Sequence, residues 1–319
     1  MKFYPITFCP IIKERIWGGR KLHTFLNKKI EIDNAGESWE ISTVSDDVSI
    51  ANGGFFVGKN LNEIIELYPE EILGKNVLDI YGLEFPLLFK FLDARQDLSI
   101  QLHPNDELAK RRHNSFGKTE MWYVMQADKD ARIVVGFKEK SNKEEYLKHL
   151  KNNSLVTILN EIKVEKGDVF LLETGTVHAI GAGIIIAEIQ QTSDVTYRIY
   201  DWDRVDANGN SRELHTKLAL EAINYETVNS LVNYPRVLNE NNSVIENAYF
   251  TTNIIPLKGA YSWKKSKEAF TVLMCTEGAF TVTMDGVVFK YNKGDTVLIP
   301  AIIKELLLNG NATVLEISI

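Results

Sequence analysis

Cysteine is nearly absent from this chain: among 319 residues there are two, Cys9 and Cys275, far apart in the sequence. Two distant thiols cannot build a disulfide framework or a cysteine-based zinc ribbon, so a hydrophobic core must hold the fold together. A chain without disulfides suits a reducing compartment. We therefore expect a cytoplasmic protein.

Long apolar runs and basic runs are also missing. No apolar stretch reaches the roughly 18 residues that a membrane span requires. The apolar start of the chain is interrupted by Pro5, Pro10 and the charged residues 13–15, so no export signal is visible. A formal net charge of −7 without a basic cluster argues against nucleic acid or an anionic membrane surface as the partner. With these classes excluded, we expect a soluble enzyme or binding protein.

Apolar residues are plentiful, at 45% of the chain, which is enough for one large core or two ordinary ones. Short extended segments are expected at 15–20 and 36–42, and the second alternates polar and apolar residues as a half-buried strand does. The apolar spacing of 61–73 predicts an amphipathic helix that Pro69 can divide in two.

The first chemical signal follows a continuous apolar segment. The pattern predicts a strand over 86–92, a turn, and a second strand over 98–103 that pairs with the first as a hairpin. Residues two apart on a strand share a face, so Gln101 and His103 would project together, and Pro104 would end the pairing. A single histidine in an apolar strand is more often a core residue than a ligand, so a metal site requires other residues to converge on it.

On the next expected strand, Lys118, Glu120 and Trp122 share one face. Burying an ionisable pair is costly without a counter-charge or a metal, so solvent exposure is the simpler interpretation of Lys118 and Glu120 when this segment is taken alone. A further strand is expected over 132–137. The charged helical insertion that follows at 143–161 is interpreted as a cap beside the sheet.

The second signal combines a turn at Gly167, a buried strand through residue 172, a turn at Gly175 and then His178. This order resembles the second sequence motif of cupins, in which a metal-binding histidine follows the second turn. Glu173 stands where that motif usually has proline. The resemblance implies a small antiparallel jelly-roll barrel, in whose interior side chains from separate strands converge. The residues that could meet there are Gln101, His103, Glu120 and His178.

A near-repeat of this motif lies late in the chain, where 291–300 aligns with 164–173. The repeat predicts a second barrel. Because Glu305 takes the position of His178 and the other ligands have no counterparts, this barrel should be structural. We therefore expect a mainly β chain of two cupin-like jelly-roll barrels with helical insertions, the second barrel lacking metal ligands. The expected parts are a catalytic cupin domain at 1–235 and a degenerate C-terminal cupin domain at 236–319.

Taken together, these segments resemble the zinc-dependent, cupin-type mannose-6-phosphate isomerases, especially their shorter bacterial form, over nearly the whole chain. The matching pieces are 17–19, 36–40, 101–104, 118–120, 175–179, Glu188, 193–194 and Arg198. The resemblance implies an aldose–ketose isomerase that interconverts mannose 6-phosphate and fructose 6-phosphate and holds one Zn²⁺ per chain. By the same resemblance, the metal ligands are Gln101, His103, Glu120 and His178, the active-site residue near the reacting carbons is Arg198, and the substrate pocket includes Lys118.

The donor types agree with this implication. Two neutral imidazoles, a carboxylate and an amide oxygen would leave a divalent ion with a net charge of about +1, electrophilic enough to polarise a carbonyl. Isomerisation through a cis-enediol also needs a base beside C1 and C2. Glu188, Asp194 and an unliganded imidazole all qualify, and the sequence does not choose between them. Many family members have proline where this chain has Thr119, a departure that bears on substrate scope more than on metal binding.

Two other classes share the expected fold. A cupin dioxygenase would bind redox-active iron, but such cupins generally carry histidine at both positions of the first paired motif, which disfavours this class for a chain with Gln101. A non-catalytic sugar-binding or sensor cupin would need neither Arg198 nor Lys118. The expected partner is a small sugar phosphate rather than nucleic acid or a membrane, and the oligomeric state stays open.

Overall fold

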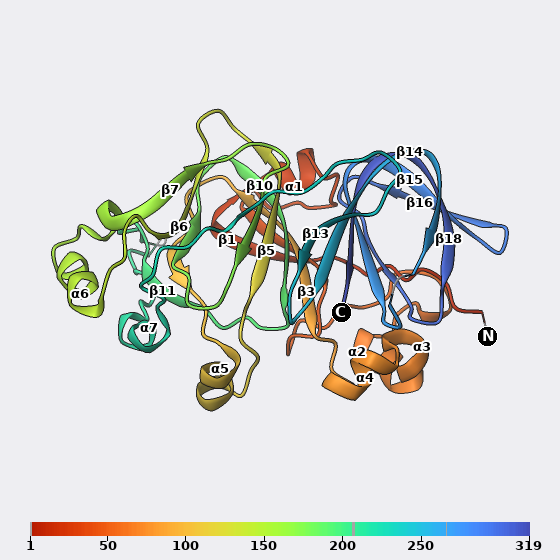
Figure 1. The fold of residues 1–319 in the computed structure, drawn as a ribbon, viewed down its shortest axis with the longest axis horizontal. Helices are drawn as coiled ribbons and strands as arrows, with labels where there is room; N and C mark the ends of the chain where they lie inside the picture. Colours follow the sequence, from red (N-terminus) through yellow and green to blue (C-terminus); the bar gives the residue numbers. More distant parts are fainter. Residues whose placement is uncertain (1, 206–207, 266) are drawn as a thin grey trace.

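The computed structural model describes residues 2–205, 208–265 and 267–319, which form a mainly β chain of three antiparallel sheets (Figure 1). The first sheet has the strand order β1 (Ile11–Gly19), β2 (Ala35–Ile41), β3 (Leu87–Ala94), β10 (Ile184–Gln191), β5 (Glu120–Ala127), β8 (Val169–Leu172) and β12 (Leu231–Val232). The second has the order β11 (Tyr197–Tyr200), β4 (Ile100–Leu102), β9 (His178–Ile180), β6 (Arg132–Phe137) and β7 (Leu159–Lys163). The third has the order β13 (Asn242–Glu246), β14 (Thr251–Lys264), β18 (Glu305–Ser318), β15 (Thr271–Met284) and β16 (Val287–Asn292), with β17 (Thr296–Ile299) also paired to β15.

Short helices occupy several connections between the strands. They are α1 (Lys21–Thr24), α2 (Leu61–Leu67), α3 (Pro69–Leu73), α4 (Lys75–Tyr81), α5 (Asp106–His113), α6 (Lys143–Lys151), α7 (Thr216–Ala222) and the 3₁₀ turns Gly54–Phe56 and Leu155–Ile158. The helix predicted at 61–73 is confirmed and is divided at Pro69, which begins α3 because its missing N–H is not needed at that position. The helical insertion expected at 143–161 ends earlier than predicted, since β7 begins at Leu159.

The first sheet is buried on both faces, and this central position organises the molecule. Trp122 and Ile186 point to one face and pack against the second sheet. Met121 and Ile189, their neighbours in alternation, point to the other face and pack against the third sheet and α2 to α4. In Figure 1 the first two sheets fill the left and centre, the third sheet lies on the right in blue, and α2 to α4 lie beneath it.

Two further apolar clusters complete the core. The third sheet curves around its own interior, where Trp263, Phe280 and Tyr291 are buried. The outer face of the second sheet is covered by helices, with Tyr146 of α6 and Ala219 of α7 packed against it. The helical segments therefore act as covers for open sheets, as predicted for the cap beside the first barrel.

The sequence repeat corresponds to a structural repeat. Gly167 and Gly294 both have φ of 92°, a left-handed conformation that favours glycine. The N–H of Gly167 donates to the carbonyl of Val124, and the N–H of Gly294 donates to that of Cys275, at 2.8 Å in both cases. The two glycine turns therefore form equivalent hydrogen bonds to a neighbouring strand, β5 in the first unit and β15 in the second. This equivalence confirms the second, jelly-roll-like unit.

The second unit departs from the first at the positions expected to matter. Glu120 lies opposite Leu172, and the equivalent pairing in the third sheet puts Thr271 opposite Ile299. Glu305, which aligns with His178, is an exposed residue at the start of β18. In the part of the chain that the structure describes, no metal-ligating cluster of histidine, cysteine and acidic residues occurs in this unit.

Two sequence-based predictions about the first sheet were wrong. The segments 86–92 and 98–103 do not form a hairpin: β3 pairs with β2 and β10, whereas β4 pairs with β9 and β11 in the other sheet. The connection between β3 and β4 crosses from one sheet to the next. The strand expected at 36–42 is not half-buried, because the third sheet and the N-terminal segment cover the face that the alternation assigned to solvent.

The chain passes from one unit to the other after residue 230. β12 still pairs with β8 in the first sheet, and β13 already pairs with β14 in the third. The boundary between 235 and 236 stays a prediction. No helix in the described ranges is both long and apolar enough to cross a membrane.

Candidate metal centre and substrate cavity

The second sheet aligns three polar side chains across adjacent strands. On β4, Gln101 is paired with His178 of β9 on one side and with Arg198 of β11 on the other. Directly paired residues of antiparallel strands project to the same face. Ile100 and Leu102 pack under the covering helices. The row of Gln101, His178 and Arg198 therefore faces inward, toward the first sheet.

The first sheet presents a second polar row to the same space. Glu120 of β5 lies opposite Gln190 of β10, and two residues further along Trp122 lies opposite Glu188, which in turn lies opposite Lys90 of β3. Trp122 belongs to the cluster between the two sheets, so its row neighbours point the same way. The otherwise apolar strands β5 and β10 thus place Glu120 and Glu188 in the interior, because the alternation of side chains along each strand puts these residues on the inner face.

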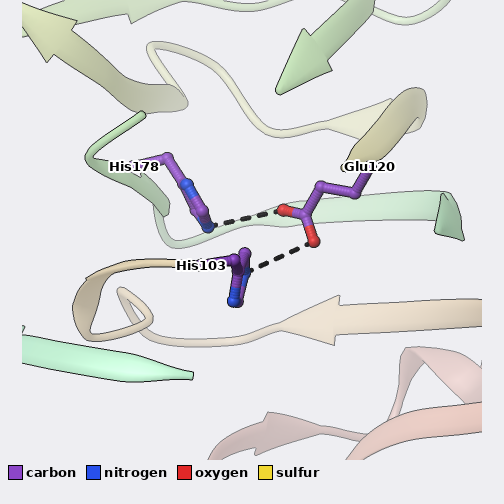
Figure 2. A group of neighbouring side chains, drawn as sticks. All are labelled: His103, Glu120 and His178. Carbon is purple, nitrogen blue, oxygen red and sulfur yellow. Dashed lines mark ion pairs between the residues drawn. The ribbon is translucent and has the colours of Figure 1, made fainter. Parts of the chain in front are cut away.

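Three of the predicted ligands form a compact buried group, shown in Figure 2. His103 Nε2 lies 3.5 Å from Glu120 Oε2, and His178 Nε2 lies 3.4 Å from Glu120 Oε1. The residues His103, Glu120 and His178 are 1%, 0% and 2% exposed. All their ligand atoms lie within 4.8 Å of one another. The two imidazoles and the carboxylate therefore converge on one point.

Hydrogen bonds orient both imidazoles toward that point. The Nδ1 of His103 lies 2.8 Å from the Val195 carbonyl, and the Nδ1 of His178 lies 2.8 Å from the Thr176 carbonyl. A carbonyl can only accept, so each Nδ1 carries the proton and each Nε2 keeps a free lone pair. Partners of this kind are typical of metal-ligating histidines.

Electrostatics keep these imidazoles neutral. Burial, followed by the charge of Lys118, lowers the pKa of His178 to about 4, and the same causes hold the pKa of His103 well below its usual range. Burial also raises the pKa of Glu120, although Lys118 opposes this. Glu120 Oε1 and His178 Nε2 are buried and have no hydrogen-bond partner among the described residues. A cation would satisfy both atoms, so the donor set fits a divalent metal.

Gln101 borders the same space but is less buried than the other three. Its Oε1 accepts a hydrogen bond from Ser99 Oγ at 3.3 Å, and its side chain lines the cavity next to His178. The structure therefore brings Gln101 beside the cluster, in register with His178 and on the same face of the sheet.

The solvent exposure considered for Lys118 and Glu120 was wrong. Lys118 is 4% exposed, and its Nζ donates to Glu120 Oε2 at 2.5 Å and lies 3.1 Å from His103 Nε2. Burial alone would lower the pKa of Lys118, but Glu120 and Glu188 raise it, so the ammonium stays charged. The counter-charges come from Glu120, the first residue of β5, and from Glu188 of β10.

Sequence reasoning missed Lys90, although Glu188 was considered. Lys90 Nζ donates to Gln190 Oε1 at 2.6 Å and lies 3.2 Å from Glu188 Oε2. Burial alone would raise the pKa of Glu188, but Lys90 and Lys118 lower it to about 2. A lysine in the middle of an otherwise apolar strand was the available signal, because such a residue must find a buried partner.

A cavity of about 630 Å³ lies between the two sheets, and its lining includes His178, Lys118 and Glu188. Its charged lining comprises six cations and five carboxylates: Lys13, Arg15, Lys90, Lys118, Arg198, Arg212, Glu14, Glu37, Asp47, Glu188 and Asp194. Trp17, Trp39 and Trp122 supply aromatic walls. A polar cavity of this size with buried cations suits a small, anionic, hydroxyl-rich ligand.

Arg198 differs from the other arginines of the cavity. Arg15 pairs with Glu37, and Arg212 pairs with Asp201. Arg198 donates to the Glu213 carbonyl at 2.9 Å and to Ser99 Oγ at 3.3 Å, and no carboxylate among the described residues pairs with it. Its charge is therefore available to a negatively charged group in the cavity.

Comparisons with known proteins agree along the whole chain. A family model for the catalytic domain of type I phosphomannose isomerase matches residues 7–139, and one for the cupin domain of mannose-6-phosphate isomerase matches 239–319. Mannose-6-phosphate isomerase ManA of Bacillus subtilis is 38% identical over 97% of this chain and 96% of its own length. Mannose-6-phosphate isomerase of Streptococcus mutans is 34% identical over 98% of this chain and 97% of its own. The crystal structure of mannose 6-phosphate isomerase from Bacillus subtilis matches with a TM-score of 0.92 at 31% identity, covering 99% of this chain and 100% of that one. The cupin-type fold is thereby confirmed.

Proposed function

Because this chain belongs to the type I phosphomannose isomerases and is an aldose–ketose isomerase, we propose that it interconverts mannose 6-phosphate and fructose 6-phosphate through a cis-enediol. The observation that carries this proposal is the convergence of His103, Glu120 and His178 beside a cation-lined cavity, whose lining includes His178. Metal-binding donors, buried cations and room for a sugar phosphate occur together there.

The proposed metal is Zn²⁺, one ion per chain, held by Gln101, His103, Glu120 and His178. Neutral imidazoles and a carboxylate suit zinc, and when bound the ion supplies Lewis-acid stabilisation of negative charge on the substrate oxygens. The single lone pair of His103 Nε2 cannot accept a hydrogen bond from Lys118 and bind an ion at the same time. With an ion held there, the Lys118 ammonium would lose His103 as a partner and would be left beside Glu188, whose Oε1 lies 3.9 Å from Nζ.

The chain's own residues supply the remaining chemistry. Arg198 donates to the enediolate oxygens as charge develops, and Lys118 binds the sugar hydroxyls beside it. The base that moves the proton between C1 and C2 is a cavity carboxylate, Glu188 or Asp194, both of which line the space. Incorporation of solvent deuterium at C2, measured with Glu188→Gln and Asp194→Asn, distinguishes them, because only loss of the base abolishes exchange.

The phosphate is held at the outer part of the cavity, where Lys13 and Arg15 are only partly buried. Their partners Asp47 and Glu37 keep these cations in place without filling the cavity. We place the enzyme in the cytoplasm, since its two cysteines are both free thiols. The units 1–235 and 236–319 serve as the catalytic and structural parts.

The test is to incubate zinc-loaded protein with fructose 6-phosphate and to identify the aldose. Mannose 6-phosphate is expected, and its formation should cease on chelation and return with added Zn²⁺. Glucose 6-phosphate as the only product would contradict the proposed substrate. Binding of sugar phosphate without turnover would move the chain to the sensor cupins, and oxygen consumption to the dioxygenases.

A further inference from the structure

Gln190 is a fully buried amide next to the site, and the chemistry above gives it no role. It lies near the end of β10, is 0% exposed, and sits on the inner face, opposite Glu120 of β5 and Leu88 of β3. A buried amide is costly unless its donors and acceptor are all paired. Its partners therefore show what it holds in place.

The amide of Gln190 joins two parts of the site. Its Oε1 accepts from Lys90 Nζ at 2.6 Å. Its Nε2 donates to the carbonyls of Gln191 at 2.9 Å and Ser193 at 2.6 Å. An ammonium can only donate and a carbonyl can only accept, so these three contacts fix the orientation of the amide without ambiguity.

Gln191 is the last residue of β10, and Ser193 lies in the turn that leads from β10 to β11. This turn carries Asp194, whose side chain lines the cavity, and Val195, whose carbonyl accepts from His103 Nδ1 at 2.8 Å. Gln190 is thus hydrogen-bonded to Lys90 at one end and to Ser193 at the other. Ser193 lies two residues before Val195, whose carbonyl orients the His103 imidazole. No other side chain on β10 contacts both parts in the described structure.

We propose that Gln190 is a positioning residue that links the cavity cation Lys90 to the orientation of His103. One end of the amide keeps Lys90 against Glu188. The other end fixes the turn, so that the Val195 carbonyl holds the His103 ring with Nε2 toward Glu120. The inference rests on the proposed function, since it assigns Lys90 to the substrate cavity and His103 to the metal.

Two substitutions separate the two ends of the amide. Gln190→Met keeps the length of the side chain but removes all three hydrogen bonds. We expect it to weaken Zn²⁺ binding about tenfold, the lower end of the effect of losing a group that orients a ligand, and to raise KM by several-fold. Gln190→Glu keeps the acceptor for Lys90 and loses the Nε2 donors. It should weaken Zn²⁺ binding similarly and leave KM within about twofold when Zn²⁺ is saturating.

A matched control is available in the third sheet. Asn242 is also a buried amide, and its Nδ2 donates to the carbonyls of Val237, Glu240 and Ile254. Asn242→Leu removes a comparable network far from the cavity. It should lower the melting temperature but leave the Zn²⁺ dissociation constant and KM within about twofold of the unaltered protein.

The measurements are Zn²⁺ competition against a chromophoric chelator, the visible spectrum of the Co²⁺-substituted protein, and kcat and KM. A changed Co²⁺ spectrum together with weaker Zn²⁺ binding in Gln190→Met supports the proposal. If Gln190→Met behaves like Asn242→Leu, with only a lower melting temperature, the positioning role is refuted. If the unaltered protein shows no isomerase activity but Zn²⁺ binding still weakens in both Gln190 variants, the proposed function fails and the link to His103 stands.

Discussion

Replacing Arg198 by alanine is the sharpest test of the proposed chemistry. Its guanidinium has one good contact, to the Glu213 carbonyl at 2.9 Å, and one long contact, to Ser99 Oγ at 3.3 Å. A typical hydrogen bond contributes about 1 kcal/mol, so Arg198→Ala should cost the fold roughly 1–2 kcal/mol and leave it intact. The substitution removes a positive charge that no carboxylate of the described residues pairs with, so we expect its main effect to be on turnover.

The kinetic effect should be far larger than the effect on stability. Removing one preorganised donor to a developing oxyanion costs about 10²- to 10³-fold in kcat, or roughly 2.7–4 kcal/mol. Arg198→Ala should therefore lose at least about 100-fold in kcat while binding fructose 6-phosphate within a few-fold. Arg198→Lys keeps the positive charge but loses the planar guanidinium, so its kcat should lie between that of the unaltered protein and that of Arg198→Ala. Ser99→Ala keeps the guanidinium and should stay within about fivefold in kcat.

The assay combines steady-state kinetics at saturating Zn²⁺ with calorimetric titration of fructose 6-phosphate and metal analysis of each variant. A loss that appears wholly in KM, with kcat retained, would reassign Arg198 to phosphate binding. An unchanged kcat/KM would remove Arg198 from the site altogether.

The remaining predictions concern the metal, the second unit and a buried ion pair. His103→Ala combined with His178→Ala should abolish metal binding, and elemental analysis showing an undiminished ion content would refute the site. Glu305→Ala should leave metal content and turnover unchanged, because the side chain is exposed at the surface. Loss of metal there would mean that the active unit was misplaced. Glu40→Gln should lower the free energy of unfolding by about 3 kcal/mol in urea titrations, because the ammonium of Lys28, 2.7 Å away and 8% exposed, loses its counter-charge. An effect below about 0.5 kcal/mol would show that this pair is solvated.

The parts of the site that depend on local geometry could be predicted from the sequence. Gly167 and Gly175 mark turns because both need positive φ, and the strand between them follows from its apolar run. The same signature recurs at Gly294, so the second unit was also predictable. The placement of His178 just past a turn needed no long-range information.

Which strands pair with one another could not be predicted from such local patterns. An apolar strand followed by a turn and another strand predicts a hairpin, yet β3 and β4 belong to different sheets, so the chain passes from one sheet to the other between them. Alternation along β2 suggested a solvent face, which the third sheet covers. The burial of Lys118 depends on Glu120 and Glu188, and the second of these lies 70 residues further along the chain.

The burial of the first sheet on both faces has a consequence for folding. On β10, Glu188 and Gln190 lie on the inner face, where Glu188 lines the cavity, and Ala187 and Ile189 point to the third sheet. A slip of one residue in pairing would put Ile189 in the cavity and a carboxylate in the apolar interface. The C-terminal unit, which carries no metal ligands of its own among the described residues, thereby makes any misaligned register of β10 costly. The C-terminal unit thereby helps to select the strand register that brings the side chains of the proposed site to the inner face.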